Sequence, residues 1–160
     1  MRRLSVVLIL SLATGVLGQA PDKLAKRYTY EVDEEKYPQK TPQEGLHSVI
    51  KAIANKKLDY LLAHLADPEY VDAKVARYTK LIDKGKEEGK TLLAFQRLLN
   101  ETQEHFLEDP ELIQELRRFA KESEWKMEEN VAVGSVKNLV GRHVFMKKMG
   151  ERWFLEQRQR

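Results

Sequence analysis

The fold is decided by residues 125–156, which read WKMEENVAVGSVKNLVGRHVFMKKMGERWFLE. At the start of this stretch Trp125 and Met127 alternate with charged residues. A period of two is typical of a half-buried strand. Further along, Gly150 separates two runs rich in β-branched and aromatic residues, which is a strong hairpin signal. We therefore predict three to four antiparallel strands in the C-terminal part of the chain.

Amphipathic helices precede this stretch. Thr41, Pro42 and Glu44 form a capping box with proline at the first helical position. Apolar residues then recur at three- and four-residue steps, which gives each segment one apolar face. Helices followed by strands indicate the α+β class, with N-terminal helices packed on a C-terminal antiparallel sheet. The predicted helices begin at Pro42, Pro68, Thr91 and Pro110, with a further short helix over about residues 58–65 that Asp59 can cap. The helix that begins at Pro68 is expected to end near Lys84.

The first eighteen residues are typical of a secretory signal peptide, because two arginines precede the apolar run 4–12 and small residues follow it. This run is too short to span a membrane, which takes about 20 apolar residues. Cleavage after Gly18 is the favoured site, and cleavage after Ala20 or an uncleaved anchor are the alternatives. We expect removal of residues 1–18, no stable membrane anchor, and a secreted or periplasmic protein of a bacterium.

Composition limits the classes of partner. The chain has 28 Lys and Arg against 25 Asp and Glu, and two of the arginines leave with the leader. A near-neutral protein has little long-range attraction for nucleic acid, so we expect no nucleic-acid partner. The absence of cysteine excludes thiolate metal sites and cysteine nucleophiles. The remaining length suits one core, so we expect a loosely held arm over residues 19–40 and a single domain over residues 41–160.

Three segments have a family likeness: TPQEGL at 41–46, KLDYLLAHLADP at 57–68 and GERWFL at 150–155. In this order they resemble the NTF2-like (cystatin-like α+β, SnoaL-like) superfamily, and within it the small secreted bacterial proteins without an assigned activity. The resemblance implies helices packed into a curved sheet, a cone that can enclose a pocket. The superfamily includes enzymes acting on small ring compounds and non-catalytic binding domains, so the shape alone assigns no function. Residues 69–122 are longer than the helical stretch of many members.

Asp59, Tyr60 and His64 are the candidate catalytic residues. In a lyase or isomerase of the SnoaL or ketosteroid-isomerase type, Asp59 or His64 would transfer a proton and Tyr60 would donate a hydrogen bond. Such a group needs an apolar pocket that shifts its pKa toward neutral pH. Helix capping is the alternative role for Asp59, as it is for Asp67. The strands carry few acids at inward positions, which favours a non-enzymatic protein.

Trp125, His143, Phe145 and Trp153 are the candidate pocket-lining residues, because side chains of a curved sheet can enclose an apolar ligand. Packing between sheet and helices is the alternative role for the aromatic residues. The histidines are scattered without metal-ligand spacing, so we expect no metal and no cofactor. The expected function is a non-enzymatic domain that binds a small apolar ligand or a protein partner, with a homodimer through the open sheet face as one arrangement.

Overall fold

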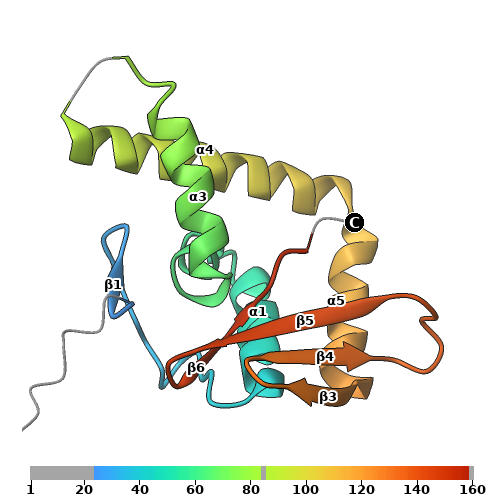
Figure 1. Cartoon of the computed structure of the whole chain (residues 1–160). Helices are drawn as coiled ribbons and strands as arrows, with labels where there is room; N and C mark the ends of the chain where they lie inside the picture. The colour runs from blue at the N-terminus through green and yellow to red at the C-terminus, as the bar shows by residue number, and fades with distance from the viewer. Residues whose placement is uncertain (1–23, 84–85, 159–160) are drawn as a thin grey trace, which may run out of the picture.

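The computed structural model describes residues 24–83 and 86–158, so the predicted signal peptide lies outside the described residues. Within them the chain has the predicted α+β class. Helices come first and pack against a four-stranded antiparallel sheet made by the C-terminal part (Figure 1). A short hairpin, β1 (Lys26–Arg27) and β2 (Tyr30–Glu31), precedes the helices. The membership of a superfamily stays a prediction.

Three helices begin as their capping residues predict. In each, a side-chain oxygen before the first proline accepts a hydrogen bond from a backbone amide of the first turn, at 3.0 or 3.1 Å. The local sequence therefore specifies these starts. The helices are α1 (Pro42–Ala54), α3 (Pro68–Thr79) and α5 (Pro110–Glu122), with caps at Thr41, Asp67 and Asp109.

Two predicted helix boundaries were wrong. Helix α3 ends at Thr79, before the predicted end near Lys84. Helix α4 (Glu87–Glu108) begins one turn before the predicted start at Thr91. Its first turn carries two glutamates, and acidic side chains stabilise a helix N-terminus through the helix dipole. The helix therefore includes Gly89, although glycine, as a helix-breaking residue, predicts that this position belongs to the preceding loop.

The second predicted helix is divided. It consists of α2 (Leu58–Tyr60) and a π-helical segment, η1 (Leu61–Leu65), in which the amide of Ala66 donates to the carbonyl of Leu61 at 2.8 Å. The proposed capping role of Asp59 is wrong, because Lys57 holds the N-cap position and Asp59 lies inside α2. Its carboxylate accepts a hydrogen bond from the next amide in the chain, at 2.8 Å. Asp59 is therefore not explained by helix capping.

The sheet has the order β3-β4-β5-β6, with every neighbouring pair antiparallel. In β3 the predicted alternation holds only in part, because Trp125 is half-buried but Met127 is 55% exposed. Strand β3 is one edge of the sheet. At the other edge, the amide of Asp67 donates to the carbonyl of Leu155 at 2.9 Å and so joins β6 to the end of η1. The strands are β3 (Glu124–Glu128), β4 (Val131–Ser135), β5 (His143–Met149) and β6 (Arg152–Leu155).

Helix α1 lies between two clusters of buried side chains. The sheet-side cluster joins α1 and α5 to the inner face of the sheet, and the helix-side cluster joins α1 to η1, α3 and α4. At Gly45, α1 comes so close to the sheet that an added Cβ would lie 2.9 Å from the carbonyl oxygen of Trp153. The sheet-side cluster includes Leu46, Phe119, Met146 and Trp153, and the helix-side cluster includes Val49, Leu65, Val75 and Leu98.

The described part of the arm is not loosely held, which corrects that expectation for residues 24–40. Arg27 is buried, and its guanidinium group binds both carboxylate oxygens of Asp72, at 2.6 and 3.1 Å. Its Nε also donates to the carbonyl of Ala63 at 2.8 Å. The ring of Tyr28 stacks on Phe95 with centroids 4.3 Å apart. The arm therefore joins η1, α3 and α4 from one side.

Candidate functional site

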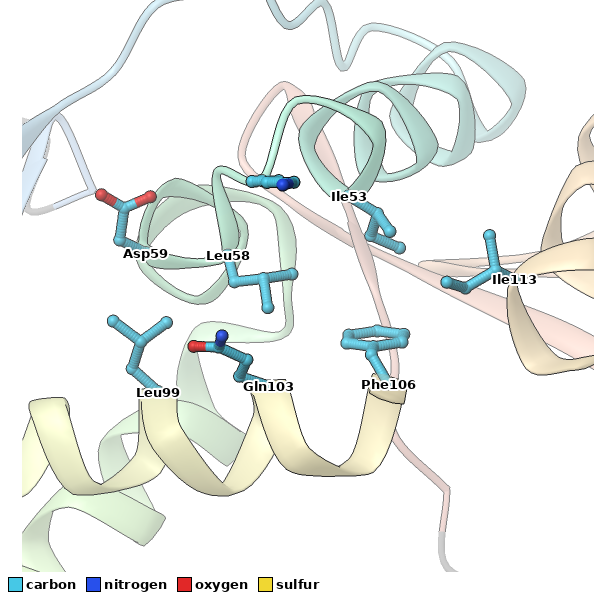
Figure 2. Close-up of a pocket in the computed structure, with 8 residues that line it drawn as sticks. Ile53, Leu58, Asp59, Leu99, Gln103, Phe106 and Ile113 are labelled. Atoms are coloured by element: carbon cyan, nitrogen blue, oxygen red, sulfur yellow. The ribbon is translucent and has the colours of Figure 1, made fainter. Parts of the chain in front are cut away.

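A cavity of about 430 Å³ opens among α1, α2, α4 and α5, and it is the candidate site. Five of its lining side chains are apolar, and three are polar. Figure 2 shows Asp59, Leu58 and Leu99 at one end, Ile113 at the other, and Ile53 facing Phe106 across the space. We call it the interhelical cavity, and its lining residues are Ile53, Lys56, Leu58, Asp59, Leu99, Gln103, Phe106 and Ile113.

The interhelical cavity lies where the two buried clusters meet. Leu58 and Leu99 pack against the helix-side cluster, and Phe106 packs against the sheet-side cluster. Ile53 packs against both. Helix α4 continues without a break from one cluster to the other, so its side chains span a gap that the side chains of neither cluster fill. The cavity is therefore a consequence of how two cores share α1 and α4.

The end of α1 shapes the rim of the cavity. The amide of Lys57 donates to the carbonyl of Ala52 at 2.8 Å, and the amide of Lys56 donates to that of Ile53 at 3.0 Å. These bonds form a Schellman motif, in which the residue after the C-cap takes a left-handed conformation. Lys56 occupies that position with φ 56°. Glycine is the usual residue there, so the rim carries a long basic side chain at a backbone cost of about 1 kcal/mol.

Three of the lining residues are polar: Lys56, Asp59 and Gln103. Asp59 is half-buried and takes part in no ion pair among the described residues, and the same holds for the exposed Lys56. Burial, together with the nearby carboxylate of Asp59, raises the pKa of Tyr30, which lies on the arm. Figure 2 shows the side-chain amide of Gln103 directed toward the middle of the cavity. By contrast, the carboxylate of Asp59 is directed away from Gln103 and Phe106 in Figure 2, and it forms a hydrogen bond with Tyr30.

Of the three candidate catalytic residues, the structure brings together Tyr60 and His64, whose ring centroids are 5.0 Å apart, and places Asp59 apart from them. Asp59 lines the interhelical cavity, whereas the hydroxyl of Tyr60 accepts from the amide of Asp33 at 2.8 Å on the arm side. His64 is fully buried, with its Nε2 2.9 Å from the carbonyl oxygen of Tyr30. A carbonyl can only accept, so this nitrogen carries the proton. Tyr60 on α2 and His64 on η1 hold the arm in place, and they do not line the cavity with Asp59.

The four candidate pocket-lining residues do not line the interhelical cavity. Trp153 is buried in the sheet-side cluster, and Trp125 packs against that cluster from β3. His143 is exposed, and its ring lies 3.0 Å from the Ser135 hydroxyl. Phe145 has the guanidinium group of Arg158 4.0 Å above its ring. The two tryptophans therefore have the core-packing role given as the alternative.

Sequence reasoning missed most of the cavity. In the sequence, Leu99, Phe106 and Ile113 are ordinary members of the apolar faces of their helices, and their half-burial depends on which elements pack beside them. Gln103 gave a weak signal, because an uncharged polar residue stands between Leu99 and Phe106 on one helical face. Without knowledge of the contact among α1, α2 and α4, that signal could not be interpreted.

Within residues 24–83 and 86–158, no group of three or more His, Asp or Glu side chains is arranged to hold a metal ion. In the same part of the chain, none of the helices combines the length and the apolar character needed to cross a membrane. In comparisons with known proteins, no family model, no curated protein and no solved structure matches this chain.

Proposed function

We propose that the protein is a non-enzymatic binding domain that takes a small, largely apolar molecule with one polar end into the interhelical cavity. The cavity itself is the observation that carries this proposal. Its volume of about 430 Å³ lies within the range of about 300–1,000 Å³ that small-molecule sites occupy. Its composition, five apolar side chains with a few polar groups, is that of a ligand site.

The polar groups support a binding role. The side-chain amide of Gln103 can orient a ligand, while Ile53, Phe106 and Ile113 exclude water from its apolar part. The separation of Asp59 from Tyr60 and His64 removes the shared geometry that an acid–base mechanism requires. By prediction from its leader, the protein would perform this binding outside the cytoplasm.

The test is binding of Nile red, an apolar dye whose fluorescence rises on entering an apolar site. We expect the wild-type protein to bind the dye, and Leu99→Trp, which fills the cavity, to weaken binding about tenfold, equivalent to about 1.4 kcal/mol. Leu93→Trp is the matched control, because Leu93 lies on the same helix and is 61% exposed. Equal dye affinity in the two variants would contradict the proposal.

A second filling variant protects the test against misfolding. Ile113→Trp fills the cavity from α5 and leaves α4 unchanged. Far-ultraviolet circular dichroism and thermal unfolding identify the variants that keep the fold. We expect every folded filling variant to bind the dye more weakly than Leu93→Trp does.

A further inference from the structure

One polar group of the interhelical cavity is directed into it. Figure 2 shows the side-chain amide of Gln103 directed toward the middle of the cavity. Among the described residues this amide makes no hydrogen bond. By contrast Gln96, which lies earlier on the same helix, donates from its amide to the side chain of Asn100 at 3.1 Å. The amide of Gln103 is therefore available to a molecule that enters the cavity.

Neither charged lining residue offers a strong counter-charge to such a molecule. The carboxylate of Asp59 is directed away from Gln103 and Phe106, and it forms a hydrogen bond with Tyr30 on the arm. Lys56 is exposed, and an ion pair with an exposed lysine contributes little. A charged ligand group would therefore lose its hydration in the cavity for little in return.

We infer that the ligand is uncharged and carries a carboxamide or lactam group, which pairs with the amide of Gln103 through two hydrogen bonds while its apolar part lies among Ile53, Phe106 and Ile113. This inference rests on the function proposed above and names the class of ligand. An amide has an N–H donor beside a carbonyl acceptor. Two amides can therefore pair head to tail, with the donor of each bonded to the acceptor of the other.

Other uncharged ligands would satisfy Gln103 less well. Gln103 is exposed, so water can bond its amide. A ligand that covers the middle of the cavity displaces this water, and any hydrogen bond that it does not replace is lost. An ester offers an acceptor but no donor, so it leaves the carbonyl oxygen of Gln103 unpaired. A carboxamide replaces both kinds of bond.

The neighbours of Gln103 favour a single polar group on an otherwise apolar ligand. Leu99 and Phe106 lie on the same face of α4, because residues three and four apart are neighbours on a helix. Ile53 faces Phe106 from α1 (Figure 2). Hydrogen bonds in apolar surroundings are electrostatically stronger than in water, so this amide can select a ligand by its polar group.

The experiment is a calorimetric titration of the full chain with three compounds that share one skeleton: hydrocinnamamide, methyl hydrocinnamate and the hydrocinnamate anion. We expect the amide to bind about tenfold more tightly than the anion. Gln103→Leu should weaken the amide about tenfold and the ester only about threefold, because the amide loses two hydrogen bonds and the ester loses one.

Gln96→Leu is the matched control. Gln96 is exposed on the same helix and does not line the cavity, so this variant should change none of the three affinities. Gln103→Glu is a second test variant, because it keeps the shape of the side chain and removes the donor. It should weaken the amide as Gln103→Leu does. Far-ultraviolet circular dichroism identifies the variants that keep the fold.

Two results would overturn the inference and leave the proposed function intact. One is Nile red binding in the cavity together with no binding of hydrocinnamamide, or with an anion that binds as tightly as the amide. The other is an affinity for the amide that folded Gln103→Leu and Gln103→Glu proteins lower no more than they lower that for the ester. If Nile red and all three compounds fail to bind the folded wild-type protein, the proposed function fails as well.

Discussion

Replacement of Gly45 by alanine tests the closest approach in the fold. The added Cβ would lie 2.8 Å from the Cε of Met146 and 2.9 Å from the carbonyl oxygen of Trp153. Met146 can move, because its contacting atom is the end of a flexible side chain. The carbonyl of Trp153 cannot move alone, because it belongs to β6 and accepts a hydrogen bond from the side-chain amide of Gln39 at 2.9 Å.

The magnitude follows from two opposing effects. Overpacking a tight contact costs about 1–3 kcal/mol. Alanine in place of glycine inside a helix returns about 0.5–1 kcal/mol, because the unfolded chain loses less freedom on folding. Because the carbonyl of Trp153 cannot move alone, the cost lies in the upper part of that range, about 2–3 kcal/mol, and we expect Gly45→Ala to lower the free energy of unfolding by about 1–2.5 kcal/mol.

Gly89→Ala is the control. Gly89 is also helical, but a Cβ added there meets no atom within 4 Å. This variant should keep the helical gain and raise the free energy of unfolding by about 0.5 kcal/mol. Urea unfolding, followed by circular dichroism and tryptophan fluorescence, measures both variants. A Gly45→Ala protein as stable as the wild type, beside a stabilised Gly89→Ala protein, would refute the claimed approach of α1 to β6.

Two further predictions concern stability. Trp153 is 4% exposed, so Trp153→Ala should lower the free energy of unfolding in urea by about 3–5 kcal/mol, and a loss below about 1 kcal/mol would contradict its place in the core. Burial and the hydrogen bond to Asp72 raise the pKa of Tyr28 in the folded state. The stability that the protonated Tyr28 contributes is therefore complete below a pH of about 10, and it is lost as the pH rises through the folded-state pKa. Unfolding free energies measured at increasing alkaline pH should therefore fall, and Tyr28→Phe should reduce the fall; an unchanged slope would be evidence against this linkage.

The elements that could be predicted are those whose signals are local. A cap such as Asp109 followed by proline fixes a helix start through bonds to its own first turn, and the structure has that start. The alternation in β3 and the turn at Gly150 likewise act over a few residues. The fold class follows from such local signals. The strand order follows as well, because consecutive hairpins place each strand beside the next one in the chain.

The parts that could not be predicted depend on contacts between distant segments. The π-helical segment η1 forms where the chain must place Ala63 beneath Arg27 and join β6 at Leu155, and no local rule foresees that. Lys56 ends α1 in a conformation for which glycine is the usual signal.

The interhelical cavity is formed by four helices together. The candidate residues that sequence reasoning took from the sheet therefore do not line it. Of the seven candidate site residues, Asp59 alone lines the cavity. Because α2 begins at Leu58, Asp59 lies inside the helix and not at the predicted cap position.

The exposed edge of the sheet has a consequence for self-association. Strand β3 carries Glu124, Lys126 and Glu128 on one face, with an ion pair of 2.7 Å between the last two. If two molecules joined these edges symmetrically about Lys126, the two lysines would stand opposite each other, and each Glu124 would face a Glu128. Like charges directly opposite each other destabilise a strand pair. The order of charges in β3 therefore disfavours a dimer formed by edge-to-edge pairing in that register, even though the backbone groups there remain open to pairing.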